Sequence, residues 1–165
     1  MQRFADAIRA YLRALTLRPD DFQSNNNLGT TYMQVGEPKE ALPYAQKAVQ
    51  LNPDDAGART NLGVVLSSLG KYEEAVTEFQ QAAELTELTP PLLLNQADAL
   101  GRLGRYEEMV NILDQVVRLE PSAAAYERMG SAYFRLQQYD EALAAFRHSA
   151  QTDDKHYPAH NGVGV

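Results

Sequence analysis

The chain has 165 residues, and 44% of them are hydrophobic, which places it with folded proteins and outside the disordered class. A formal net charge of −7 argues against nucleic-acid binding, because proteins that bind nucleic acid need a basic surface to displace counterions. The sequence has no cysteine, which excludes disulfides, thiolate nucleophiles and sulfur-ligated zinc.

The first predicted element is an amphipathic helix over residues 2–19. It carries an apolar stripe of Phe4, Ile8, Tyr11 and Leu15, with arginines scattered through the pattern. A signal peptide would instead separate a basic start from an unbroken apolar run. No segment of the chain approaches the ~18 apolar residues that cross a bilayer. We therefore expect a soluble, cytoplasmic protein with no membrane partner.

Two series of small residues run through the chain with one shared period. One series has an alanine, or once a methionine, every 33 or 34 residues: Ala7, Ala41, Ala75, Met109 and Ala142. The other series is mostly glycine: Gly29, Gly63, Ala97, Gly130 and Gly164. A repeat of this length is a pair of helices that cannot bury its apolar face alone and must stack on its neighbours.

The copy over residues 22–55 shows how each pair of helices begins and ends. Asp20 or Asp21 can cap the first helix, whose end needs a left-handed residue such as glycine. The second helix is closed by Pro53, and Pro43 inside it should produce only a slight kink. The equivalent turns between the two helices are marked by Gly36, Gly70 and Gly104.

Several segments carry the same markers in register: NNLGTTY, TNLGVVL, KYEEAVTEFQQAAEL, RYEEMVNIL and QYDEALAAFRHSA. With a period of 34 residues, the whole chain resembles the tetratricopeptide repeat family. The resemblance implies an all-α fold: a right-handed superhelical solenoid of antiparallel helix pairs, with about nine full helices and a short tenth. Residues 1–165 then form a single solenoid. It divides into a half repeat (1–21), full repeats (22–55, 56–89, 90–122 and 123–156) and the start of another (157–165).

The third copy departs most from the family pattern. Gln96 and Ala97 stand where leucine and glycine are expected, and Met109 stands where alanine is expected. Glu87 replaces proline in the preceding junction, TELTPP. We expect a local change of superhelical angle and looser stacking around Thr86–Gln96. The family's tryptophan is also missing, and its position is held by Asn25, Arg59, Leu93 and Tyr126.

The resemblance implies a concave groove, formed by the first helices of the repeats, that binds a peptide of another protein. Asn27, Asn61 and Asn95 share one repeat position, where an amide can donate to and accept from a peptide backbone. Asparagine at this position can equally serve only to wet the surface, so both interpretations stay open. The expected groove residues are Asn26, Asn27, Thr30, Met33, Asn61, Val64, Leu94, Asn95, Asp98, Arg102, Arg128 and Phe134.

The expected groove also narrows the class of ligand. It lacks the lysines with which chaperone-binding relatives hold a C-terminal carboxylate, so that ligand is not expected. Arg102, Arg128 and Arg135 can still take an acidic side chain, because guanidinium groups bind carboxylates through two parallel hydrogen bonds. The alternative is that these arginines form an ordinary solvated face.

No pattern in the sequence predicts catalysis. The carboxylate pairs Glu73–Glu74, Glu107–Glu108 and Asp140–Glu141 recur at the start of second helices, where negative charge suits the helix dipole. His156 and His160 flank Pro158 and have no evident third ligand, so no metal site is predicted. Phosphate loops, nucleotide fingerprints and nucleophile elbows are absent, and we expect neither a catalytic residue nor a cofactor.

These observations predict a non-catalytic scaffold that binds a peptide segment of a partner protein. One alternative is a substrate-recruiting repeat region of a larger enzyme. Another is a module that self-assembles weakly, head to tail, through its open ends. In that case the opening helix of residues 157–165 would dock on the N-terminal apolar stripe of a second copy.

Overall fold

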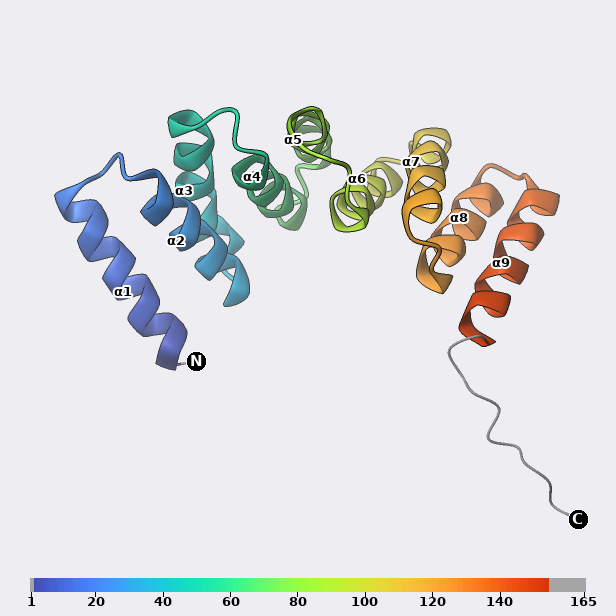
Figure 1. The fold of residues 1–165 in the computed structure, drawn as a ribbon, viewed down its shortest axis with the longest axis horizontal. Coiled ribbons are helices and arrows are strands. Elements are labelled where there is room, and N and C mark those ends of the chain that lie inside the picture. The colour runs from blue at the N-terminus through green and yellow to red at the C-terminus, as the bar shows by residue number, and fades with distance from the viewer. Residues whose placement is uncertain (1, 155–165) are drawn as a thin grey trace, which may run out of the picture. The chain divides into compact units, whose positions relative to one another are not determined.

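The computed structural model describes residues 2–154. All the regular secondary structure in this part of the chain is helical, which confirms the predicted all-α class (Figure 1). The predicted short helix over residues 157–165 lies outside the described residues. The described helices are α1 (Gln2–Leu17), α2 (Phe22–Gln34), α3 (Pro38–Leu51), α4 (Ala56–Ser68), α5 (Tyr72–Leu85), α6 (Pro90–Arg102), α7 (Tyr106–Leu119), α8 (Ala123–Arg135) and α9 (Tyr139–Asp154).

The helices form two compact units, Met1–Leu88 and Thr89–Val165. In the first unit, α2 packs on α3 and α4 on α5, while α1 covers α2 and α3 contacts α4. In the second unit, α6 packs on α7 and α8 on α9, and α7 joins the two pairs. The boundary at Leu88 and Thr89 falls inside the atypical TELTPP junction. Each unit is therefore built from helix pairs that stack on one another.

Side-chain caps start most of the first helices. Asp21 accepts a hydrogen bond from the Ser24 backbone N–H at 2.9 Å, and Asp55 caps α4 in the same way at 2.7 Å. Hydrogen bonds from the Ser24 side chain and backbone hold the pKa of Asp21 below its usual value. Thr89 makes no such side-chain bond, and α6 instead begins with proline.

Tight turns with left-handed backbone connect the two helices of each pair. The φ angles are 81° at Gly36, 77° at Gly70 and 73° at Gly104, as the glycines predicted. The fourth turn has the same conformation at Gln137, with φ 62°. Its backbone hydrogen bonds match those of the glycine turns, since the N–H of Gln138 donates to Tyr133 at 3.0 Å as that of Glu37 donates to Tyr32 at 2.9 Å.

Gln137→Gly is expected to raise the free energy of unfolding by about 0.5–1 kcal/mol. Left-handed backbone costs a residue with a Cβ about 1–2 kcal/mol, and glycine returns part of this gain as extra entropy of the unfolded chain. Urea denaturation measures the difference. The matched control, Gly70→Gln, is expected to destabilise the chain by a similar amount, and a loss of stability in Gln137→Gly contradicts the prediction.

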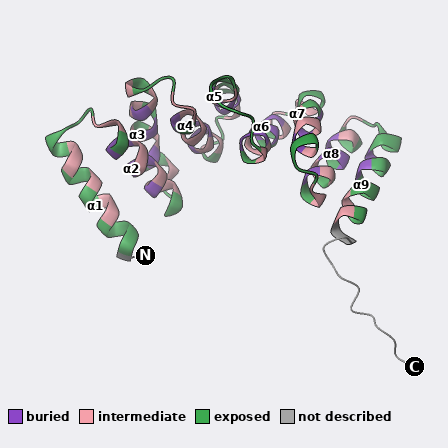
Figure 2. Cartoon of the chain, viewed as in Figure 1, coloured by how far each residue is buried: buried purple, intermediate pink, exposed green. Residues whose placement is uncertain are grey.

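Small residues in the first helices make room for side chains of the second helices. A Cβ built on Gly63 would lie 2.5 Å from the Phe79 ring, and one on Gly130 would lie 2.7 Å from the Phe146 ring. Buried positions follow the helix faces that meet within each unit (Figure 2). In the third copy, the same two positions hold Ala97 and Leu113, both fully buried. Ala97 is larger than the glycine of the other repeats, and Leu113 is smaller than their phenylalanine, so the two changes offset each other. We call this size compensation between the two positions the packing rule.

Two of the four residues that replace the family's tryptophan hold the preceding loop in place through hydrogen bonds. Asn25 Nδ2 donates to the Pro19 carbonyl at 3.0 Å, and Arg59 Nε donates to the Pro53 carbonyl at 2.7 Å. Tyr126 stacks on His148, with ring centroids 5.3 Å apart. Leu93 is buried but cannot hydrogen-bond, so the junction before α6 lacks this tie.

Candidate peptide-binding surface

The first helices of the repeats, α2 and α4 in one unit and α6 and α8 in the other, carry the candidate site. A cavity of about 280 Å³ lies between α2 and α4. It brings together four of the predicted residues, Thr30, Met33, Asn61 and Val64, with Gln34 and Val65. Its side chains are neutral, and apolar groups make up much of its wall.

The asparagines that share one repeat position, Asn27, Asn61 and Asn95, form what we call the asparagine ladder. Two of their amides already have partners within the chain. Asn61 Nδ2 on α4 donates to Asn26 Oδ1 on α2 at 2.9 Å, which ties the two first helices together. Gln23 Nε2 donates to Asn27 Oδ1 at 3.0 Å along α2. A primary amide has two N–H donors and two acceptor lone pairs, so each keeps capacity for a ligand. Asn61 therefore acts as a brace between helices, a role that the repeat period did not predict.

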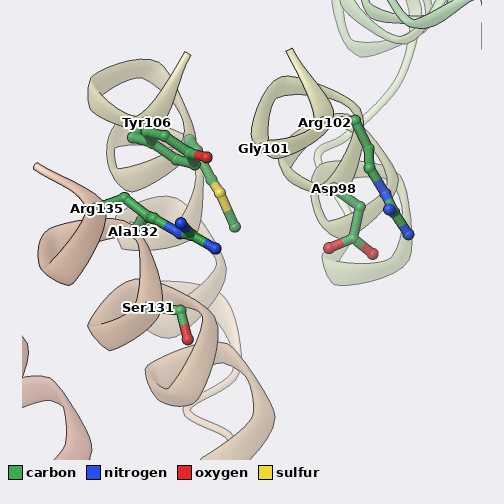
Figure 3. Close-up of a pocket in the computed structure, with 8 residues that line it drawn as sticks. Asp98, Gly101, Arg102, Tyr106, Ser131, Ala132 and Arg135 are labelled. Atoms are coloured by element: carbon green, nitrogen blue, oxygen red, sulfur yellow. The ribbon is translucent and has the colours of Figure 1, made fainter. Parts of the chain in front are cut away.

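The second unit has a larger cavity, of about 380 Å³, on its helices α6, α7 and α8 (Figure 3). It includes the predicted Asp98 and Arg102 but not Leu94, Asn95 or Phe134. The full lining is Asp98, Gly101, Arg102, Tyr106, Met109, Ser131, Ala132 and Arg135. The second helix α7 thus contributes to this cavity, whereas the cavity in the first unit is lined by first helices alone.

Arg128 braces the second unit at the repeat position that Asn61 holds in the first. Its Nε donates to Asp98 Oδ1 at 2.9 Å, and a second N–H reaches the Ala124 carbonyl at 3.3 Å. The Asp98 carboxylate is therefore neutralised by Arg128. Within residues 2–154, Arg102 and Arg135 have no carboxylate partner.

The remaining predicted residues lie around the cavities. Phe134 is 58% exposed, and its ring meets Tyr139 edge to face, with centroids 5.6 Å apart. Leu94 and Asn95 are half-buried on α6. These positions can extend a binding surface beyond the cavities, although none of them lines either cavity.

Models of the tetratricopeptide repeat match residues 20–88 and 94–156, and a further model of the same repeat matches residues 1–36. The chain belongs to the tetratricopeptide repeat family. Helices α2 to α9 are thus the helix pairs of a tetratricopeptide repeat (TPR) array, and α1 packs on the first of them.

Solved TPR structures share this architecture. The crystal structure of MamA is 25% identical, with a TM-score of 0.89 over 93% of this chain and 90% of that one. MamA from Desulfovibrio magneticus RS-1 is 24% identical, with a TM-score of 0.75 over 81% of this chain and 76% of that one. YrrB, described as a TPR protein with an unusual peptide-binding site, is 24% identical, with a TM-score of 0.76 over 89% of this chain and 76% of that one. Curated protein sequences give no match. Together these likenesses support a role in protein interaction.

Sequence reasoning missed how the TPR chain builds the cavity of its second unit. Met109 replaces the usual alanine, and a Cβ on Gly101 would lie 2.9 Å from its sulfur. Gly101 therefore accommodates the Met109 side chain at a position where the other repeats have Met33, Ser67 and Phe134. The combination of a glycine in the first helix and a large residue in the second was the available signal.

The repeated carboxylate pairs stabilise helix starts. Glu73–Glu74, Glu107–Glu108 and Asp140–Glu141 lie in the first turns of α5, α7 and α9, and all are exposed. Lys71 Nζ lies 2.9 Å from Glu74, and Arg105 Nε lies 2.6 Å from Glu108. The hydrogen bond from Arg105 holds the pKa of Glu108 below its usual value. A carboxylate that stays ionised at a helix N-terminus supports the structural interpretation.

Two further expectations concern metals and membranes. Within residues 2–154, no three histidine, aspartate or glutamate side chains are grouped as metal ligands. His156 and His160 lie outside the described residues, and so does the segment of residues 157–165 that the self-assembly hypothesis docks on a second copy. The N-terminal apolar stripe on which that segment would dock lies on α1. In the stripe, Phe4 is 38% exposed, and Ile8, Tyr11 and Leu15 are half-buried. None of the described helices has the length and apolar character needed to span a bilayer.

Proposed function

We propose that the chain is a non-catalytic scaffold that binds a peptide segment of a partner protein on the first helices of its repeats. The main support for this proposal is that each unit has a cavity lined from the same repeat positions. Thr30, Met33 and Gln34 on α2 correspond to Asp98, Gly101 and Arg102 on α6. Likewise, Val64 and Val65 on α4 correspond to Ser131 and Ala132 on α8. Each unit therefore offers its own concavity to a peptide segment.

The chemistry of the first unit favours recognition of a peptide backbone. Its cavity is neutral, and Asn61 retains one N–H and its carbonyl after bracing Asn26. Met33 and Val64 offer an apolar wall for a ligand side chain. The peptide-binding site named for YrrB supports the same use of a TPR surface.

Replacing Asn27, Asn61 and Asn95 together with alanine is expected to weaken peptide binding at least tenfold. Each amide hydrogen bond contributes on the order of 0.5–1.5 kcal/mol, and about 1.4 kcal/mol is a factor of ten in affinity. Peptides are first selected on the full chain from a random display library and then measured by calorimetry.

Two controls accompany this measurement. Asn111→Ala, on the exposed surface of the second helix α7, should leave affinity unchanged. Circular dichroism should show equal helicity in all variants. Failure to select any peptide contradicts the proposed function, whereas unchanged affinity in the triple variant contradicts only the role of the ladder.

A further inference from the structure

The cavity of the second unit differs from that of the first in its charge. Figure 3 shows Tyr106, Ser131 and Arg135 on one side of the cavity, with the Tyr106 hydroxyl directed toward the other side. On that other side, the Asp98 carboxylate lies nearer the cavity than the Arg102 guanidinium. Arg128 pairs with Asp98 at 2.9 Å, so the one carboxylate of the lining is neutralised. Arg102 and Arg135 then leave the cavity with a positive charge that no described carboxylate offsets.

This local charge runs against the charge of the whole protein. The chain carries a formal net charge of −7, yet two exposed guanidinium groups from different helices line one cavity. Ser131 and Tyr106 add hydroxyl donors to the same space. Guanidinium groups bind the oxygens of carboxylates and phosphates bidentately, and a hydroxyl can donate to an oxygen left over.

The shape of the cavity also fits a side chain more than a whole ligand. Gly101 admits the Met109 side chain, and Met109 and Ala132 give the cavity an apolar base. The cavity of about 380 Å³ lies at the lower end of the range for small-ligand sites. An apolar base excludes water beneath the charged groups, which strengthens their attraction for an anion.

We propose that this cavity receives an oxyanionic side chain, carboxylate or phosphoryl, of a partner peptide bound on the first helices of the second unit. Arg135 on α8 and the hydroxyls of Tyr106 and Ser131 contact the anion from one side of the cavity. The exposed Arg102 side chain on α6 turns toward the anion from beyond Asp98. The inference rests on the proposed function, because it names the chemistry that one subsite of that surface selects. The neutral cavity of the first unit receives no such group.

The test uses peptides selected on the full chain from a random display library and labelled for fluorescence polarisation. Selected peptides are expected to share an acidic residue, and its replacement by the corresponding amide should weaken binding at least about tenfold. Arg102→Gln/Arg135→Gln should weaken the acidic peptide by the same factor and leave the amide peptide unchanged. Arg118→Gln on α7, whose side chain is 77% exposed and lies outside the cavity lining, is the matched control and should change nothing.

A phosphoserine version of each peptide distinguishes the two sources of the oxyanion. Tighter binding than the glutamate version assigns a phosphoryl group, and weaker binding assigns a carboxylate; either result supports the inference if it depends on Arg102 and Arg135. Selected peptides without acidic residues, or an affinity that the double variant leaves unchanged, overturn the inference while the proposed function stands. If no peptide is selected, the proposed function fails and this inference fails with it.

Discussion

Phe79→Ala is expected to lower the free energy of unfolding by about 3–5 kcal/mol, the largest loss at any single position of the first unit. The Phe79 side chain is fully buried and is the largest such side chain in the described chain. Its ring fills the space left by Gly63, where a Cβ would come within 2.5 Å of a ring carbon. Equilibrium urea denaturation, followed by circular dichroism, measures the change.

A double-mutant cycle tests the reason for this loss. Gly63→Ala alone is expected to destabilise the chain by about 1–3 kcal/mol, although alanine favours the helix by up to about 1 kcal/mol. In the Phe79→Leu background the same change should cost nothing or stabilise, because Ala97 and Leu113 form the equivalent buried combination in the third repeat. A coupling energy near zero would falsify the packing rule.

The repeat period predicted the helices because every local signal agreed with it. Gly36, Gly70 and Gly104 marked turns that the structure places in left-handed backbone. Gln137 has no such signal, yet its turn adopts the same conformation. The packing of α8 on α9 and the hydrogen bond from Gln138 to Tyr133 fix the turn, so tertiary structure overrides the local preference of glutamine.

The candidate site was less predictable because it depends on contacts between repeats. A period places Asn61 and Arg128 at one repeat position, but it does not say which side chain of the preceding helix each one meets. Asn61 pairs with Asn26 and Arg128 with Asp98, at two different repeat positions. The contribution of Tyr106 was equally hidden, since second helices normally supply core residues.

The junction between the two units is expected to exchange its amide hydrogens faster than the equivalent junction of the first unit. At the junction within the first unit, the N–H groups of Asn52 and Asp55 donate to backbone carbonyls at 3.0 and 3.3 Å. The side chain of Arg59 also holds the Pro53 carbonyl at 2.7 Å. At the junction between the two units, the exposed residues Thr86, Glu87 and Leu88 have no backbone hydrogen bond from their N–H groups within the described chain.

Hydrogen–deuterium exchange should therefore show at least about tenfold faster labelling over Thr86–Gln96 than over Asn52–Leu62. Thr89→Asp is a matched test of the cause, because Thr89 holds the repeat position at which Asp21 and Asp55 cap their helices. The new carboxylate should accept a hydrogen bond from the backbone of Leu92 and slow exchange at the start of α6. It should leave the amides of Glu87 and Leu88 unprotected, because they precede the helix and gain no acceptor. Equal labelling of the two segments in the unaltered chain contradicts the prediction. It would mean that the junction between the units is as stable as the junction of residues 52–55, although it lacks the proline and the hydrogen bond that Arg59 makes to the loop.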